Sequence, residues 1–137
     1  MKRSLLLIAL ASLSAPLAAP KPLSVQVSNA QIKEGLPGVP DGVLYVTLKN
    51  TGQTNVKLLG GSTAIARKVL PMKNHAIGSH GDLDLTVRPG KTLAFTPGGN
   101  HLMLMGLRRA PKVGERVKVT LTFDAGRVTI TVPVKNY

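Results

Sequence analysis

The sequence predicts an all-β domain, a Greek-key β-sandwich or barrel of roughly seven to nine strands. No window keeps the 3.6-residue periodicity of an amphipathic helix, whereas many short segments alternate apolar and polar residues as half-buried strands do. Ten prolines and fourteen glycines separate these segments with turns. The chain has 137 residues, 43% of them hydrophobic, so a single domain with a real core is expected.

The alternation is clear in three segments of the first two thirds of the chain. These segments are residues 23–27 (LSVQV), 43–48 (VLYVTL) and 83–87 (LDLTV). Residues 32–42 are rich in glycine and proline, which predicts a long loop between the first two strands.

The C-terminal part predicts a β-hairpin. Residues 116–123 and 127–132 both place apolar or β-branched side chains at every second position. Asp124-Ala125-Gly126 links them as a short turn in which the glycine is expected to adopt positive φ. Pro89-Gly90 and Pro97-Gly98-Gly99 predict two further turns.

Residues 1–20 have the organisation of a signal peptide. The basic start Met1-Lys2-Arg3 precedes an apolar run over residues 4–13 and a segment of small residues and prolines. The run is shorter than the about 20 residues that span a membrane, although an uncleaved anchor or a buried strand is an alternative. We expect residues 21–137 to form the mature domain outside the cytoplasm, in the periplasm or another extracytoplasmic compartment. Because cysteine is absent, we expect no lipoprotein anchor, disulfide or thiolate metal site.

The chain is strongly basic, with 18 Lys and Arg against six Asp and Glu. Removing Lys2 and Arg3 with the signal peptide lowers the net charge from +12 to +10. The basic residues are scattered and the aromatic residues form no base-stacking series, so we expect no nucleic-acid partner. The charge favours an acidic protein partner or association with an anionic membrane surface, and solubility alone is the alternative.

The sequence lacks the motifs of an enzyme active site. No nucleophile elbow and no phosphate-binding glycine loop is present. Asp82 and Asp84 share one face of the predicted strand at 83–87, where a solvated surface explains them, and they lack the further oxygen ligands of a calcium loop. We therefore expect a protein that is not an enzyme.

Histidine and methionine are concentrated in one part of the chain. Apart from the initiator, all of them fall within residues 72–105. They are Met72, His75, His80, His101, Met103 and Met105. Thioether sulfur is a soft neutral ligand that binds Cu(I) and has little affinity for Mg²⁺ or Ca²⁺, and imidazole suits copper as well. Two His with two Met would make a neutral Cu(I) site, although Met also serves as a gap-filler in cores.

The spacing of these residues gives a first idea of the site. His101 and Met103 are two apart in an alternating segment, so their side chains are expected on one face of a strand beside the turn at residues 97–99. Met72, His75 and His80 fall in or beside residues 71–81, which Pro and Gly mark as a loop.

Residues 97–107 (PGGNHLMLMGL) closely resemble the signature of the periplasmic copper chaperones called PCu(A)C. Residues 45–52, 87–90 and 121–134 resemble further parts of the same family, so the resemblance covers about residues 23–134. It implies a cupredoxin-like β-sandwich that binds one Cu(I). It also implies delivery of copper to the dinuclear copper centre of cytochrome c oxidase, which makes an oxidase subunit the expected partner of a monomeric chaperone.

The resemblance implies that His101 and Met103 are copper ligands. It departs from the family at the first ligand pair, because counting back from His101 at the family's spacing reaches Ser79 and Lys68. The chemistry of the donors points to Met72 and His80 as the other two ligands, with His75 as the competing donor. Met105 is interpreted as a core residue or as a hydrophobic rim that shields the metal.

Two other functions stay open at this point. The altered first pair is compatible with a structural or interaction β-sandwich that has lost its metal site. A copper redox protein is disfavoured, because the missing cysteine excludes a blue-copper centre.

Overall fold

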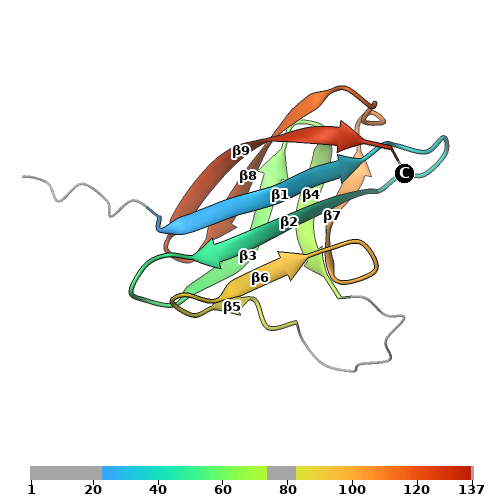
Figure 1. Ribbon diagram of the computed structural model, residues 1–137. Coiled ribbons are helices and arrows are strands. Elements are labelled where there is room, and N and C mark those ends of the chain that lie inside the picture. The colour runs from blue at the N-terminus through green and yellow to red at the C-terminus, as the bar shows by residue number, and fades with distance from the viewer. Residues whose placement is uncertain (1–22, 74–82, 137) are drawn as a thin grey trace, which may run out of the picture.

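The computed structural model describes residues 23–73 and 83–136, which form nine β-strands and no helix (Figure 1). The strands are β1 (Val25–Lys33), β2 (Gly42–Asn50), β3 (Val56–Thr63), β4 (Ala66–Met72), β5 (Thr86–Val87), β6 (Thr92–Phe95), β7 (His101–Leu107), β8 (Arg116–Phe123) and β9 (Gly126–Lys135). The all-β prediction is therefore confirmed. The predicted signal peptide, His75, His80, Ser79 and Asp82 lie outside the described residues.

Seven of the strands close into a barrel. Their order is β1-β9-β8-β3-β4-β7-β2, and β2 pairs with β1 to complete the circle. Strands β7 and β6 pair with the same edge of β2: β7 pairs with the first half of β2, and β6 pairs with its second half. Strand β5 pairs with the start of β3. Closure removes the unpaired edges that an open sheet would expose. It also fixes β4, β7 and β2 as consecutive strands of one wall (Figure 1).

The interior of the barrel is filled by the alternating inward side chains of its strands. Fully buried examples come from β2, β3, β7 and β8, and these are Leu44, Leu58, Leu102, Leu104 and Leu121. Burial of side chains this large contributes about 1.5–3 kcal/mol each. The alternation sets the direction of every other side chain on the same strands, because successive residues point to opposite faces.

Asn50 is a buried polar residue at the far end of β2, and all of its hydrogen-bonding groups have partners. Its Nδ2 donates to the carbonyl oxygens of Thr54 and Val87, at 2.7 Å and 2.8 Å. Its Oδ1 accepts from the Gly52 N–H at 2.9 Å. The side chain thus ties the β2–β3 turn to β5, where a buried polar group without partners would be costly.

The predicted strands agree with the structure best at the C-terminus. The hairpin of β8 and β9 turns at residues 124–125, and Gly126 has the expected positive φ of 152°. The predicted loop at 32–42 is shorter, because β1 continues to Lys33. The strand predicted at 83–87 is reduced to Thr86–Val87. Here the Asp84 carboxylate accepts a hydrogen bond from the Thr86 N–H, a local side-chain contact that competes with strand pairing.

No described segment forms a helix that could cross a membrane.

Candidate metal centre

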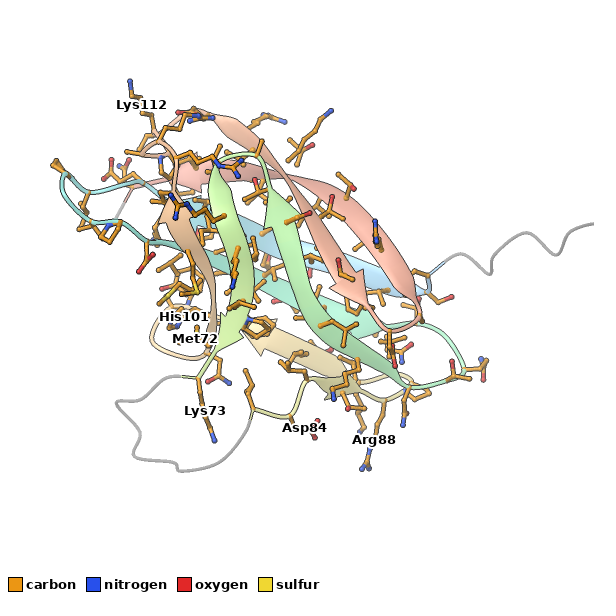
Figure 2. All side chains as sticks on the ribbon, turned by 180° about the vertical axis from the view of Figure 1, so that it is seen from behind. Met72, Lys73, Asp84, Arg88, His101 and Lys112 are labelled. Atoms are coloured by element: carbon orange, nitrogen blue, oxygen red, sulfur yellow. The ribbon has the colours of Figure 1, made fainter. Side chains whose placement is uncertain are left out.

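The pairing of β4 with β7 brings separate parts of the sequence together. Met72 lies directly opposite His101, and Leu70 lies opposite Met103. Residues opposite each other in an antiparallel pair project on the same side of the sheet, with Cβ atoms about 4.5–5.5 Å apart. Since Met103 is two residues after His101, all three donors Met72, His101 and Met103 share one face, and Met72 and His101 lie next to each other in Figure 2.

A tight turn positions His101 as the first residue of β7. The Thr96 N–H donates to the Asn100 carbonyl at 3.1 Å, and the Gly99 N–H donates to the Thr96 carbonyl at 2.9 Å. Gly98 has φ of 79°, a conformation that glycine adopts without steric cost. The glycine-rich segment therefore determines where β7 begins and which way its first side chain points.

The donors lie on the outside of the barrel. Leu102 and Leu104 are fully buried, whereas His101, Met103 and Met105 are half-buried, as alternation along one strand requires. Every methionine and the single histidine within residues 23–73 and 83–136 thus project from one outer wall. Methionines that only fill the core would lie in the interior of the barrel, so these methionines are not explained by core packing.

The geometry of this wall suits a small soft cation. His101 and Met72 form the closest pair, and Met103 is the diagonal neighbour of Met72, at about 7–8 Å with the Cβ atoms somewhat closer. Methionine has three flexible side-chain bonds, so the two sulfur atoms can approach a metal held near the His101 ring. One imidazole and two thioethers are then available from the described residues.

The electrostatic surroundings disfavour hard divalent cations. Neither β4 nor β7 contains an acidic residue, and Lys68 lies opposite Met105 on the same wall. No three His, Cys, Asp or Glu side chains of the described segments form a metal-binding group. A neutral donor set beside a lysine is best matched to a monovalent, soft ion such as Cu(I).

The structure corrects two expectations for individual residues. Met72 was expected in a loop, but it is the last residue of β4, because Pro71 and Met72 pair with Leu102 and His101. Met105 is not a core residue: it is half-buried on the outer wall, so only the interpretation as a rim remains. His75 and His80 follow Met72 in the chain and lie outside the described residues, so their roles stay predictions.

The structure also shows where the family's ligand spacing, counted back from His101, falls on β4. Lys68, the position reached by counting back from His101, projects from the same wall as the donors but pairs with Met105. The donor from β4 that faces His101 is Met72. Counting along the sequence therefore does not identify the partner of His101, and only the pairing register shows which β4 side chain is adjacent to it.

Sequence reasoning missed the apolar residues that flank the donors. Leu70 of β4 and Val43 of β2 both pair with Met103, one from each side. Leu70 is exposed and Val43 is half-buried. No signal in the sequence identified Leu70, because β4 lacks the alternation that predicts a strand. These side chains lower the local polarity around the Met103 sulfur.

Comparisons with known proteins agree with this fold. The LpqE-like family, described as "Putative lipoprotein LpqE-like", matches residues 25–134. The protein "Putative lipoprotein Lxx21020" of Leifsonia xyli subsp. xyli is 32% identical over 119 residues, which cover 82% of this chain and 70% of that protein.

Solved structures of PCuAC domains share the fold. The copper-bound PCuAC domain of PmoF2 superposes with a TM-score of 0.72 at 24% identity, covering 83% of this chain and 94% of that domain. The solution structure of CuI-DR1885 from Deinococcus radiodurans has a TM-score of 0.61 at 34% identity, covering 80% of this chain and 78% of that protein. The predicted resemblance to the PCu(A)C family and the cupredoxin-like fold are thereby confirmed.

Proposed function

The chain belongs to the LpqE-like family, and from this premise we propose that it is an exported Cu(I)-binding metallochaperone. The observation that carries the proposal is the convergence of Met72, His101 and Met103 on one outer wall of the barrel. The copper-bound state of the similar CuI-DR1885 structure supports it. Export is supported by the lipoprotein names of the family and of its relative.

The donor chemistry fits transport of copper better than catalysis. Neutral thioethers hold Cu(I) without stabilising Cu(II), so the ion is carried without a change of oxidation state. The ligands are not thiolates, which in an oxidising compartment would be lost to disulfides. Because the donors are half-buried on the outer wall, an acceptor can approach them directly and exchange ligands stepwise, with a weak thioether leaving first.

We propose His80 as the fourth ligand and His75 as its competitor. The acceptor that we propose is the dinuclear copper site of a cytochrome c oxidase subunit, met by a monomeric chaperone. The excess of basic residues would steer the chaperone towards an acidic face of that subunit.

An anaerobic Cu(I) titration against a chromophoric chelator tests copper binding. The unaltered mature protein is expected to saturate at one equivalent. His101→Ala and Met103→Leu should each weaken binding by at least about tenfold, because each removes a donor that a soft ion requires. Met105→Leu is the matched control, since it removes a thioether from the same strand and the same wall but outside the donor set.

The variants separate the competing interpretations. If the unaltered protein takes no copper from a weak chelator, the chain is a structural β-sandwich and the chaperone proposal is wrong. If Met105→Leu weakens binding as much as Met103→Leu does, the donor set is misassigned. Loss of binding in His80→Ala, with His75→Ala unaffected, would support the proposed fourth ligand. Incubating the Cu(I)-loaded protein with the soluble domain of the oxidase subunit then tests delivery through the visible absorption of the dinuclear centre.

A further inference from the structure

Two turns at the end of the barrel opposite the β6–β7 turn carry exposed aliphatic side chains. Of the five large hydrophobic residues that are exposed among the described ones, three belong to these turns. Leu36 is 40% exposed, Val39 46% and Val113 50%. We propose that this end of the barrel docks the protein onto an anionic membrane surface. We call it the loop end and define it as residues 35–40 and 108–114.

The first turn is built to hold apolar groups in water. Residues 36–40 (LPGVP) are all exposed, and none has a polar side chain. The Val39 N–H donates to the Leu36 carbonyl at 3.2 Å, with Pro37 and Gly38 in the central positions and a φ of 74° at Gly38. This is the pattern of a type II turn, in which proline and glycine keep the backbone rigid. The turn thus presents Leu36 and Val39 without a large entropic cost of ordering them on contact.

The second turn repeats the same design. The Glu115 N–H donates to the Lys112 carbonyl at 3.0 Å, and Gly114 has φ of 92°. Val113 is therefore held at the tip, between the exposed Lys112 and the turn glycine. Apolar side chains next to cationic ones are the combination by which interfacial segments bind an anionic bilayer surface.

The two turns form one continuous surface. The Gly35 N–H donates to the Pro111 carbonyl at 2.7 Å, and the Leu107 N–H donates to the Pro40 carbonyl at 2.8 Å. A Cβ at Gly35 would lie 2.7 Å from the Ala110 Cβ, so the loops pack with no room for a side chain between them. Both tips can consequently contact the same flat surface.

The charges of the loop end match an anionic surface. Arg108, Arg109 and Lys112 are exposed, whereas the acidic residues that flank the two turns, Glu34, Asp41 and Glu115, are half-buried. The nearby Glu115 carboxylate is paired with Arg109 and also accepts a hydrogen bond from the Lys112 N–H. Each Lys or Arg close to an anionic leaflet adds attraction that decays within a Debye length, so binding must weaken with salt. Small apolar tips on rigid turns fit the interior of a headgroup layer, whereas an acidic protein would be matched by a groove or a flat face.

The orientation of β7 makes this docking compatible with the metal centre. His101 is the first residue of β7, and Leu107, the last, is bonded to the loop end. Six residue steps of about 3.3 Å separate His101 from Leu107, so the His101 end of β7 lies about 20 Å along the strand from the residue that contacts the loop end. Figure 2 shows Lys112 at one end of the molecule and Met72 with His101 towards the other. A protein docked by the loop end would keep its donors facing the aqueous phase.

Sedimentation with vesicles tests this inference. The mature protein is expected to bind vesicles of phosphatidylglycerol with phosphatidylcholine, to bind phosphatidylcholine alone weakly, and to dissociate at high salt. Val39→Asp and Lys112→Glu should each weaken binding by at least about tenfold. Leu59→Asp is the matched control for Val39→Asp, because Leu59 is 52% exposed but lies on β3. Lys91→Glu is the matched control for Lys112→Glu, because Lys91 is exposed in the turn between β5 and β6.

A fluorescence measurement separates insertion from simple electrostatic adsorption. The chain has no tryptophan, so Val39→Trp and the control Leu59→Trp each create a single reporter. The emission of Val39→Trp should shift to shorter wavelength on the anionic vesicles, and that of Leu59→Trp should not.

Three results would overturn the inference. The first is absence of binding to the anionic vesicles, which would leave an acidic protein as the partner of this end. The second is an equal loss of binding in the control variants. The third is binding without a shift of the Val39→Trp emission. Because none of these variants alters a proposed donor, Cu(I) affinity should stay unchanged throughout, so the two proposals fail independently.

Discussion

Strand β7 presents its even-numbered side chains to the interior of the barrel and its odd-numbered side chains to the outside. On the inner face, Leu102 and Leu104 are fully buried; on the outer face, His101, Met103 and Met105 are half-buried. One short segment thus contributes both to the core of the barrel and to the candidate metal centre. The inner side chains hold the barrel closed, and the outer ones are free to be chosen for their chemistry. Substitutions on the two faces should therefore have different consequences.

Leu104→Ala should give the largest change in stability. It removes a fully buried side chain and leaves a cavity, which lowers the free energy of unfolding by about 2–5 kcal/mol. Urea denaturation measures the change. Leu70→Ala is the matched control, because it deletes the same atoms from the outer wall, where Leu70 is 38% exposed and the cost should be much smaller. Equal losses in both variants would contradict the division between the faces.

Asn50→Ala should give the next largest effect, and it extends the comparison to a polar interior group. The substitution leaves the carbonyl groups of Thr54 and Val87 and the Gly52 N–H without their partner. We expect the free energy of unfolding to fall by about 1–3 kcal/mol, because water can satisfy only part of this set. Hydrogen exchange at the Gly52 amide should accelerate more than exchange in β8, and uniform acceleration would contradict a local role.

Met103→Leu should have a small effect on stability. The two side chains have similar volumes, so the free energy of unfolding should change by less than about 1.5 kcal/mol. Thermal unfolding without copper measures this change. If addition of Cu(I) stabilises the unaltered protein but not the variant, the outer face holds the metal without holding the fold. A large loss of stability in the copper-free variant would show that Met103 is a packing residue.

The smallest effect concerns the exposed Arg109–Glu115 pair. The hydrogen bond from the Arg109 guanidinium holds the pKa of the Glu115 carboxyl below its usual value. Because the pKa of the folded state is the lower one, this pair stabilises the fold above the unfolded pKa and the contribution is lost as the pH falls through the folded value. Exposed pairs contribute little, so the expected change in stability is slight. Arg109→Ala should raise the pKa of Glu115 in an NMR titration, and an unchanged pKa would show that the pair is not formed in solution.

Much of the secondary structure and the type of donor atom in the candidate site could be predicted from the sequence alone. Alternation along residues 116–123 and 127–132 identified the hairpin of β8 and β9, because one face of each strand packs on the core and the other is more exposed to solvent. Soft donors confined to residues 72–105 predicted a site for a soft metal ion. The His101-Leu102-Met103 spacing predicted two side chains on one face, since strand geometry alone determines that relation.

The residues that join His101 and Met103 could not be predicted from the sequence, because strand pairing brings them together. Strand β4 has little alternation, since Arg67 and Lys68 are both exposed and Pro71 interrupts the pattern, so neither its existence nor its register could be predicted. A shift of one residue in that register would turn Met72 to the opposite face. The same holds for the loop end, where Leu36 and Val113 are far apart in the sequence. Such contacts depend on the closure of the barrel, which is a property of all its strands together and of no single segment.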